Sequence, residues 1–308
     1  MIVLAFINCT ESDLGRLDYA SLSQQELMEM VIAGLENPEK ICGSREEPID
    51  VAEWKGVKID SETLEIVEIN WYSKYLKGSI DMQWLPATVG TVYLSDNSLT
   101  GTVDLTCLSP IMRELWCSIN EFFGSLELRK LPESLHKLVA YRNDFTGSVC
   151  LTELPAELSC VDISRNHLSG SLNLCSLPKA MERLSMRSNQ FTGSVDLTHL
   201  PDGLTSLHIS ENQLSGSVDL TSLPSFLKSL DLSDNMFSDN VDLTQLPPRI
   251  CLLHLSQNNF SGETDFTRIP ESMKSLDVSA TNLSGKMYSD KAKLYRLHEN
   301  LNIKKEKK

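Results

Sequence analysis

The chain repeats one arrangement of hydrophobic and polar positions along most of its length. In SLDLSDNMFSDNVDLTQLP, residues 229–247, two leucines flank a polar residue, which is the period of a short strand with one buried face. A turn through Asn235 follows, then the bulky Phe237, a second alternating triplet at 241–243, and a Leu-Pro pair. This pattern predicts a strand, a turn, a short second strand at 241–243, and further turns before the next strand.

The asparagine of this turn recurs without any insertion or deletion. Eight asparagines are spaced 23 residues apart: Asn97, Asn120, Asn143, Asn166, Asn189, Asn212, Asn235 and Asn258. Thr281 takes the ninth place, and Lys74 lies one period before the first asparagine, in a divergent repeat. We therefore expect ten repeats over residues 64–288, stacked as an α/β solenoid. Its parallel sheet is expected on the concave side, with short second strands and turns on the convex side.

Two residue types of the repeat have clear physical roles. The asparagine amide both donates and accepts, so stacked asparagines satisfy backbone groups that the turn removes from water. A glycine four residues later indicates a backbone conformation, or a close approach, that other residues avoid. Asp239 replaces this glycine in one repeat, and we expect a distorted turn there.

Separate segments are expected to cap both ends of the solenoid. Residues 1–63 form the predicted N-terminal cap, where Ser23 and Glu26 make a capping box that opens a helix over about 23–36. Residues 289–308 form the predicted C-terminal cap and basic tail. Leucines at helical spacing in this cap are expected to shield the last strand edge: Leu294, Leu297 and Leu301. The opening MIVLAF is either a truncated export signal or a segment packed on the first domain.

Composition narrows the classes of partner. A net charge of -14 and a pI near 4.9 disfavour nucleic acid and anionic membranes, and favour a basic partner. The eight cysteines form no C-x-x-C pair, so we expect reduced thiols and neither a zinc site nor a disulfide framework. No stretch approaches the roughly 18 apolar residues of a membrane span. The compartment stays open between the cytoplasm, which is favoured, and secretion.

The repeat LxxLxLSxNxLSGSVDLTxLP resembles leucine-rich-repeat proteins, in particular those abundant in kinetoplastid protists. Its LSGxV element, and a W-x-G-V core at Trp54–Val57 in the preceding EWKGVKIDSETLEIVEINW, are more distantly similar to plant extracellular leucine-rich-repeat receptors. The resemblance covers about residues 64–288 and implies a horseshoe-shaped solenoid used for protein recognition. The paired cap cysteines, membrane anchor and kinase domain of the plant receptors are missing from this sequence, so we do not expect a plant-type surface receptor.

Variable strand positions that point outward from the concave sheet are the expected place for function. The N-terminal half of this surface gathers aromatic and basic side chains, and these are candidate ligand-binding residues: Tyr72, Tyr93, Trp116, Lys137, Tyr141, Arg142, Arg165 and Arg187. Such side chains on one solvent face are typical of interaction hot spots. The alternative is that they only cover the sheet by stacking on one another.

The C-terminal half alternates histidine and aspartate on adjacent strands, and His208, Asp231 and His254 complete the candidate ligand-binding set. Two imidazoles and a carboxylate are a known set of metal ligands. The alternatives are cross-strand charge pairing, in which the acids make the histidines more basic, or a pH-sensitive ligand contact. We predict no cofactor. A separate acidic column would attract cations or a basic partner, or forms a solvated rim, which is the interpretation we favour: Asp104, Glu127, Asp196, Asp219, Asp242 and Asp265.

No catalytic motif accompanies the repeats. The sequence therefore predicts a non-enzymatic scaffold, a monomer, that recognises an unidentified protein partner on its concave face. An exported or surface-associated protein that binds glycans or host molecules is the alternative. A metal-dependent enzyme at His208, Asp231 and His254 is a third hypothesis.

Overall fold

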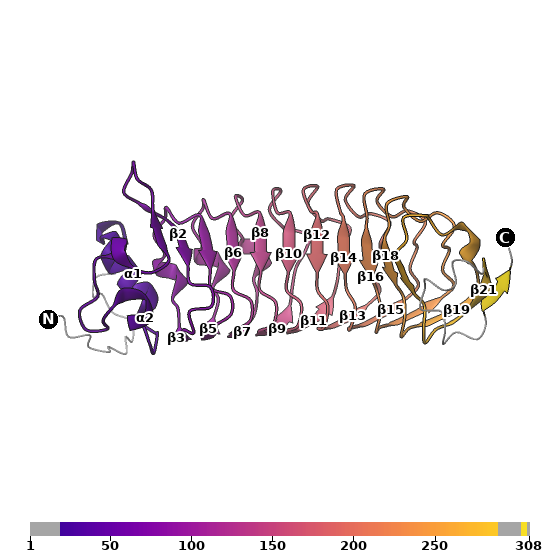
Figure 1. Ribbon diagram of the computed structural model, residues 1–308, viewed down its shortest axis with the longest axis horizontal. Coiled ribbons are helices and arrows are strands. Elements are labelled where there is room, and N and C mark those ends of the chain that lie inside the picture. The colour runs from indigo at the N-terminus through magenta and orange to yellow at the C-terminus, as the bar shows by residue number, and fades with distance from the viewer. Residues whose placement is uncertain (1–18, 289–302, 307–308) are drawn as a thin grey trace.

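The computed structural model describes residues 19–288 and 303–306, which wind into one long solenoid (Figure 1). Two sheets of eleven strands run along it. In the first sheet, β1 pairs antiparallel with β2 and all the following strands are parallel. Its strands are β1 (Val57–Ile59), β2 (Ile66–Asn70), β4 (Thr91–Tyr93), β6 (Glu114–Trp116), β8 (Lys137–Val139), β10 (Cys160–Asp162), β12 (Arg183–Ser185), β14 (Ser206–His208), β16 (Ser229–Asp231), β18 (Leu252–His254) and β20 (Ser275–Asp277). The ten parallel strands correspond to the ten predicted repeats.

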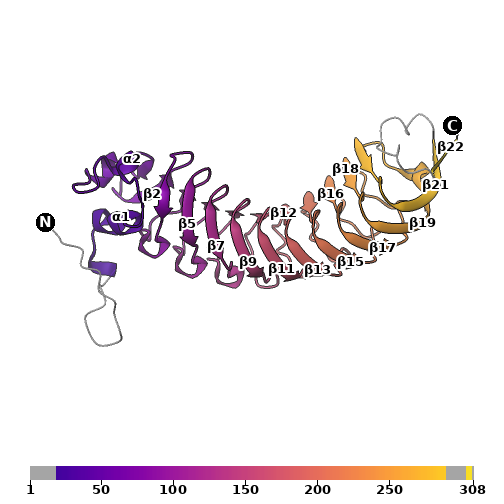
Figure 2. The same ribbon diagram turned by 90° about the horizontal axis from the view of Figure 1, so that it is seen from below.

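The second sheet uses the short strand that follows each turn. It consists of β3 (Lys77–Ser79), β5 (Ser98–Thr102), β7 (Glu121–Gly124), β9 (Asp144–Ser148), β11 (His167–Ser171), β13 (Gln190–Gly193), β15 (Gln213–Gly216), β17 (Met236–Asp239), β19 (Asn259–Asp265), β21 (Asn282–Tyr288) and β22 (Ile303–Glu306). Figure 2 shows the solenoid bent into a shallow arc, with β12, β16 and β18 on its inner side and β15, β17 and β19 along its outer side. The predicted leucine-rich-repeat horseshoe, with its concave parallel sheet, is confirmed.

The second strands lie earlier in the repeat than the alternation at 241–243 predicts. Strand β17 begins directly after Asn235, and residues 241–243 are outside it. Val241 and Leu243 are buried as expected, but the Asp242 carboxylate accepts the Thr244 N–H at 2.8 Å and bends the chain. An aspartate that bonds its own backbone two residues on makes a turn instead of an extended strand.

The asparagine ladder is present as predicted. The Asn189 amide donates to the carbonyls of Ile163 and Met186 at 3.1 Å each, and its oxygen accepts the Leu168 N–H at 3.0 Å. One side chain therefore bonds the backbone of its own turn and of the turn before it. The equivalent asparagines repeat these bonds along the solenoid, so buried backbone groups keep partners.

The residue before each of the eight asparagines, and before Thr281 in the ninth place, adopts a left-handed backbone, which the sequence pattern did not predict. These residues have φ between 52° and 62°: Asp96, Ile119, Arg142, Arg165, Ser188, Glu211, Asp234, Gln257 and Ala280. Asp239 is left-handed too, at φ 68°, and still pairs with Phe260 of β19. The expected distortion at Asp239 is therefore wrong, because aspartate tolerates the conformation that glycine has in the other repeats.

One continuous core fills the solenoid. The bulky position two residues after each asparagine is fully buried, and the Phe237 and Phe260 rings stack 6.1 Å apart. Turns and short 3-10 segments connect the strands on the convex side: η3 (Met82–Trp84), η4 (Leu105–Cys107), η5 (Leu128–Lys130) and η6 (Phe266–Arg268). This arrangement leaves the middle residue of each concave strand buried, and its two neighbours half-exposed at most repeats.

The N-terminal cap contains α1 (Gln24–Ile32), α2 (Glu39–Cys42), η1 (Tyr19–Ser21) and η2 (Val51–Glu53). The Ser23–Glu26 capping box is present, but α1 ends at Ile32, before the predicted end near 36. The chain leaves the helix because Leu35 pairs with Gly78, and a side chain at Gly34 would collide with Ser79. The cap thus covers the N-terminal edge of the second sheet, and β1 covers the N-terminal edge of the first sheet.

At the other end, β22 extends the second sheet beside β21. The leucines predicted to cap this end, Leu294, Leu297 and Leu301, lie outside the described residues. In the described ranges, no helix is long and apolar enough to cross a membrane.

Candidate functional site

Four predicted aromatic residues surround one hollow on the concave face. Tyr72, Tyr93, Trp116 and Tyr141, with Asn70 and Ser95, line a space of about 260 Å³, which we call the aromatic hollow. Parallel register brings them together, because Asn70 pairs with Tyr93 and Tyr93 pairs with Trp116 on neighbouring strands. The Tyr93 and Trp116 rings are 6.0 Å apart and tilted by 42°. The Tyr72 side chain is the most open of the four, with 57% exposed.

Glu114 organises the aromatic hollow, and the sequence pattern did not identify it. Its carboxylate accepts the Trp116 indole N–H at 2.9 Å and the Tyr93 hydroxyl at 3.3 Å. The ammonium of Lys137 donates to the other carboxylate oxygen at 2.9 Å. Burial alone would raise the pKa of Glu114, but the hydrogen bonds from Lys137 and Trp116 outweigh it and lower that pKa. Burial beside this carboxylate raises the pKa of Tyr93.

The backbone beneath the hollow is held by small hydroxyls. Ser95 accepts the Ser118 N–H, and Ser118 accepts the Tyr141 N–H, each at 3.1 Å. Serine occupies this repeat position at Ser95, Ser118, Ser164, Ser210, Ser233, Ser256 and Ser279, whereas Tyr72, Tyr141 and Arg187 replace it. Tyrosine at a position that is serine in most repeats thus contributes Tyr72 and Tyr141 to the lining of the hollow.

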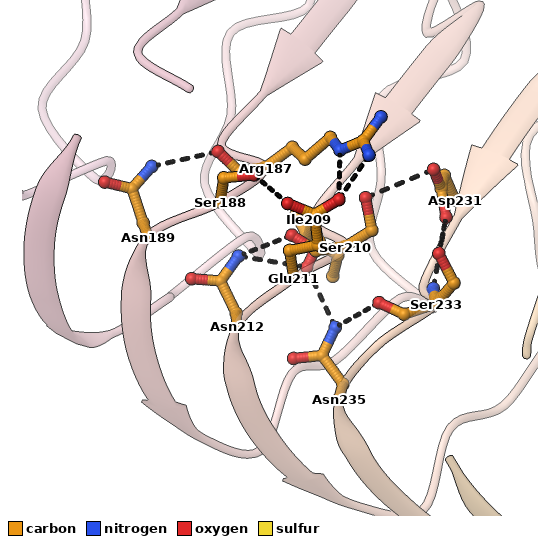
Figure 3. A network of polar contacts seen from close by, with 10 residues as sticks. All are labelled: Arg187, Ser188, Asn189, Ile209, Ser210, Glu211, Asn212, Asp231, Ser233 and Asn235. Atoms are coloured by element: carbon orange, nitrogen blue, oxygen red, sulfur yellow. Dashed lines mark hydrogen bonds and ion pairs between the residues drawn. The ribbon is translucent and has the colours of Figure 1, made fainter. Parts of the chain in front are cut away.

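The four predicted basic residues divide into two kinds. Lys137 pairs with Glu114, and Arg187 pairs with Glu211, which also accepts a hydrogen bond from the Ser188 hydroxyl (Figure 3). Arg142 and Arg165 are exposed, and within residues 19–288 no ion pair engages either of them. They are therefore the two predicted cations that remain available to a partner.

The Arg187–Glu211 pair closes a polar network in the middle of the concave face. The guanidinium donates two hydrogen bonds to one Glu211 oxygen, the longer at 3.0 Å, which raises the pKa of Arg187. Ser188 and Arg187 in turn lower the pKa of Glu211. Figure 3 shows this pair beside Asp231, which bonds Ser210 and Ser233. Arg187 is thus a structural residue of the sheet surface.

His208, Asp231 and His254 lie in register on β14, β16 and β18, as predicted, but their ligand atoms do not converge. The Asp231 carboxylate is occupied by the Ser233 hydroxyl at 2.6 Å and the Ser210 hydroxyl at 3.1 Å. His208 Nε2 bonds the Ser229 hydroxyl at 2.7 Å. Among the described residues, the set is not one of the groups that could hold a metal.

The expected basic shift at the histidines is wrong for His208. Burial lowers the pKa of the His208 imidazole, and the nearby Asp231 only partly opposes this effect. The ring is therefore held neutral by its surroundings.

The acidic column consists of turn-forming residues. Asp104, Asp196, Asp219, Asp242 and Asp265 each accept the N–H two residues later at 2.8 Å. Glu127 makes no such cap bond. All six carboxylates are exposed, as predicted for a solvated rim, and the five aspartates also close convex turns.

Comparison with known proteins places the fold and leaves the ligand open. No protein-family model matches the sequence, and neither does any curated protein. Among solved structures, the leucine-rich-repeat ectodomain of the receptor kinase GASSHO1/SCHENGEN3 from Arabidopsis thaliana aligns with a TM-score of 0.65 and 19% identity. That alignment covers 86% of this chain and 33% of the ectodomain, so the chain spans about a third of the length of this neighbour.

Two further structures are similar. The functional domain of InlJ from Listeria monocytogenes aligns with a TM-score of 0.60 and 18% identity, over 79% of this chain and 54% of that domain. A plant ice-binding protein aligns with a TM-score of 0.54 and 20% identity, over 82% of this chain and 89% of that protein. Together with the ten stacked turns, these likenesses define the fold as the leucine-rich-repeat solenoid.

Proposed function

We propose that this protein is a non-enzymatic binding scaffold whose aromatic hollow docks a segment of a protein partner. The observation that carries the proposal is the ordering of the hollow by Glu114, whose carboxylate accepts hydrogen bonds from both Tyr93 and Trp116. Binding to rings that are already oriented loses little side-chain entropy, so more of the contact energy becomes affinity. Tyrosine, tryptophan and arginine are also the residues that dominate interface energetics.

The chemistry of the hollow favours a mixed segment. Its floor is apolar and aromatic, which suits an aliphatic or aromatic anchor of the partner. Arg142 follows Tyr141 in sequence and, like Arg165, is exposed, so an acidic group next to the anchor would be paired there. The net charge of -14 still favours basic groups elsewhere on the partner.

The fold neighbour from Arabidopsis supports a binding role for a solenoid of this kind, because its ectodomain was solved in complex with CASPARIAN STRIP INTEGRITY FACTOR 2. We propose that the present chain acts as a monomer. Its N-terminal sheet edges are covered by β1 and by the pairing of Leu35 with Gly78, which disfavours edge-to-edge association there.

A glycan ligand is the second candidate, since an exposed tyrosine beside a half-buried tryptophan also offers a stacking surface to a sugar ring. In this alternative the protein is exported or associated with a surface. Both candidate ligands would bind in the aromatic hollow. They differ in whether the bound group is a polypeptide segment or a sugar.

Affinity capture with the immobilised chain tests the proposal. The double variant W116A/Y141A should lose at least tenfold of the captured material, while F123A and F226A should lose none. Phe123 and Phe226 are matched controls because they are 48% and 44% exposed and lie outside the hollow. Capture that survives deglycosylation but not proteolysis supports a protein partner, and the reverse supports a glycan. Equal capture by W116A/Y141A and the parent chain would remove the hollow from consideration.

A further inference from the structure

Two convex turns bring a thiol, a carboxylate and an imidazole together. Cys175 lies in one turn, and Asp196 and His199 lie in the corresponding turn of the next repeat. Their ligand atoms, Cys175 Sγ, an Asp196 oxygen and a His199 ring nitrogen, all lie within 4.8 Å of one another. Among the residues that the structure describes, this is the one group of three or more such side chains with that spacing.

The turn itself orients the carboxylate. Asp196 Oδ1 accepts the Thr198 N–H at 2.8 Å and the Thr198 hydroxyl at 2.6 Å, which fixes the plane of the carboxylate. Its second oxygen, Oδ2, is then directed at the other two groups, at 2.9 Å from His199 Nδ1 and 3.6 Å from Cys175 Sγ. One oxygen builds the turn, and the other is left for the cluster.

Comparison among the repeats shows that the cluster is peculiar to this place. The position of Cys175 is threonine in six other repeats: Thr106, Thr152, Thr198, Thr221, Thr244 and Thr267. The position of His199 is occupied in other repeats by Ser176, Ser222, Gln245 and Arg268. The turn needs neither a cysteine nor a histidine, because Asp219 and Thr221 make the same bonds in the next repeat. A cysteine at a position that is mostly threonine and a histidine at a variable position therefore meet across adjacent turns.

We propose that Cys175, Asp196 and His199 bind a divalent transition-metal ion of the zinc type, with water completing the coordination. Thiolate and imidazole ligands favour zinc and cobalt over calcium and magnesium, which prefer all-oxygen sites. Ligand distances of about 2.0 to 2.3 Å from one ion require the three atoms to approach by small side-chain rotations. All three residues are exposed, so such rotations are open to them.

The surrounding field favours a cation. Asp219 and Asp242 follow Asp196 in the acidic column, and the negative charges of Asp196 and Asp242 repel that of Asp219. Like charges in a row attract divalent cations to this side of the solenoid. Binding displaces one proton from Cys175, and His199 binds through Nδ1 with its remaining proton on Nε2. Affinity should increase as the pH rises.

We predicted no zinc site from the sequence because it contains no C-x-x-C pair. The site proposed here does not need such a pair. The sequence separates Cys175 from Asp196 by 21 positions. Only the 23-residue turn of the solenoid brings them side by side.

Cobalt and zinc titrations of the untagged, chelator-treated chain test the proposal. We expect one cobalt ion per chain and a thiolate-to-cobalt charge-transfer band, with zinc displacing cobalt. C175S should abolish the band, and H199Q should weaken zinc binding at least tenfold in competition with a chromophoric chelator. Two variants are matched controls: C251S removes a half-buried thiol elsewhere, and D219N changes the equivalent carboxylate one repeat away. Both should retain the charge-transfer band and the zinc affinity. Circular dichroism checks that each variant folds. A parent chain without the band, or a band that persists in C175S, would overturn the assignment.

Discussion

The indole N–H of Trp116 donates a 2.9 Å hydrogen bond to the carboxylate of Glu114, two residues earlier on β6. Residues two apart on a strand share a face, so the acid lies on the concave surface beside the ring that it holds. The same carboxylate binds Tyr93 and Lys137 on the neighbouring strands β4 and β8. A charged residue thus fixes the geometry of a surface whose contacts are mostly apolar.

Substituting Glu114 tests this relationship. E114Q removes the ion pair with Lys137 and loosens the Trp116 ring, so partner capture should fall severalfold. The free energy of unfolding should fall by less than about 1 kcal/mol, since a partly exposed ion pair contributes little to stability. Urea unfolding and quantitative capture measure the two effects. E121Q, an exposed glutamate on β7, is the control.

Glu114 also makes a pH prediction. Its pKa is lowered in the folded chain from an ordinary value of 4.5, so its contribution to stability is present above pH 4.5 and is lost as the pH falls below it. E114Q should therefore show a shallower decline in unfolding free energy below pH 4.5 than the parent chain. Identical pH curves for the two proteins would contradict the lowered pKa.

The buried asparagines should be costly to replace. Asn166 donates to the carbonyls of Ala140 and Ile163 at 3.1 and 3.0 Å and accepts the Phe145 N–H at 3.1 Å. N166A leaves these groups buried without partners, and we expect a loss of about 2 to 4 kcal/mol in urea unfolding. N259A, at an exposed asparagine, should change the unfolding free energy by less than about 0.5 kcal/mol.

Asp239 offers a stabilising change. Its φ of 68° is one that glycine adopts freely and other residues adopt at a cost. D239G should raise the free energy of unfolding by up to about 1 kcal/mol, and the matched G216D should lower it by a similar amount. A destabilised D239G would show that the carboxylate has a structural role which outweighs the backbone strain.

His208 should make the fold sensitive to mild acid. Burial keeps the pKa of the folded imidazole below 6.5, so the unfolded chain binds the proton more readily. Stability is then full above about pH 6.5 and declines as the pH falls below it. H208Q retains a group that can bond Ser229 but does not titrate there, so it should reduce this decline. Unfolding curves between pH 7 and pH 5 measure the difference, and a slope equal to that of the parent chain would contradict the prediction.

Much of the fold follows from the sequence because the repeat is so regular. Local residue chemistry is enough to predict the period, the buried leucines, the asparagine ladder and the capping box at Ser23. The position of the second strands cannot be predicted in this way. The alternation at 241–243 arises because Val241 and Leu243 are buried, and the backbone there is not part of a strand. The bond from Asp242 to the Thr244 N–H decides that the chain turns there.

The candidate site was predictable in part. A column of outward positions brought Tyr93 and Trp116 together, because parallel register follows from a constant period. The directions of side chains did not follow. His208 and Asp231 are neighbours in register, yet each bonds a different serine. Glu114 was missed because an acid within an aromatic cluster has no distinctive spacing. Its position next to Trp116 on a strand is the signal that was available.

The uninterrupted period limits how this chain can change in length. Each asparagine joins its own turn to the one before it, so a segment can be gained or lost without harm only in whole multiples of 23 residues. Unequal crossover between near-identical copies produces such steps. Each step would lengthen or shorten the concave surface by one strand and leave the remaining joints intact, so a descendant gene could acquire a larger recognition face without redesigning its interior.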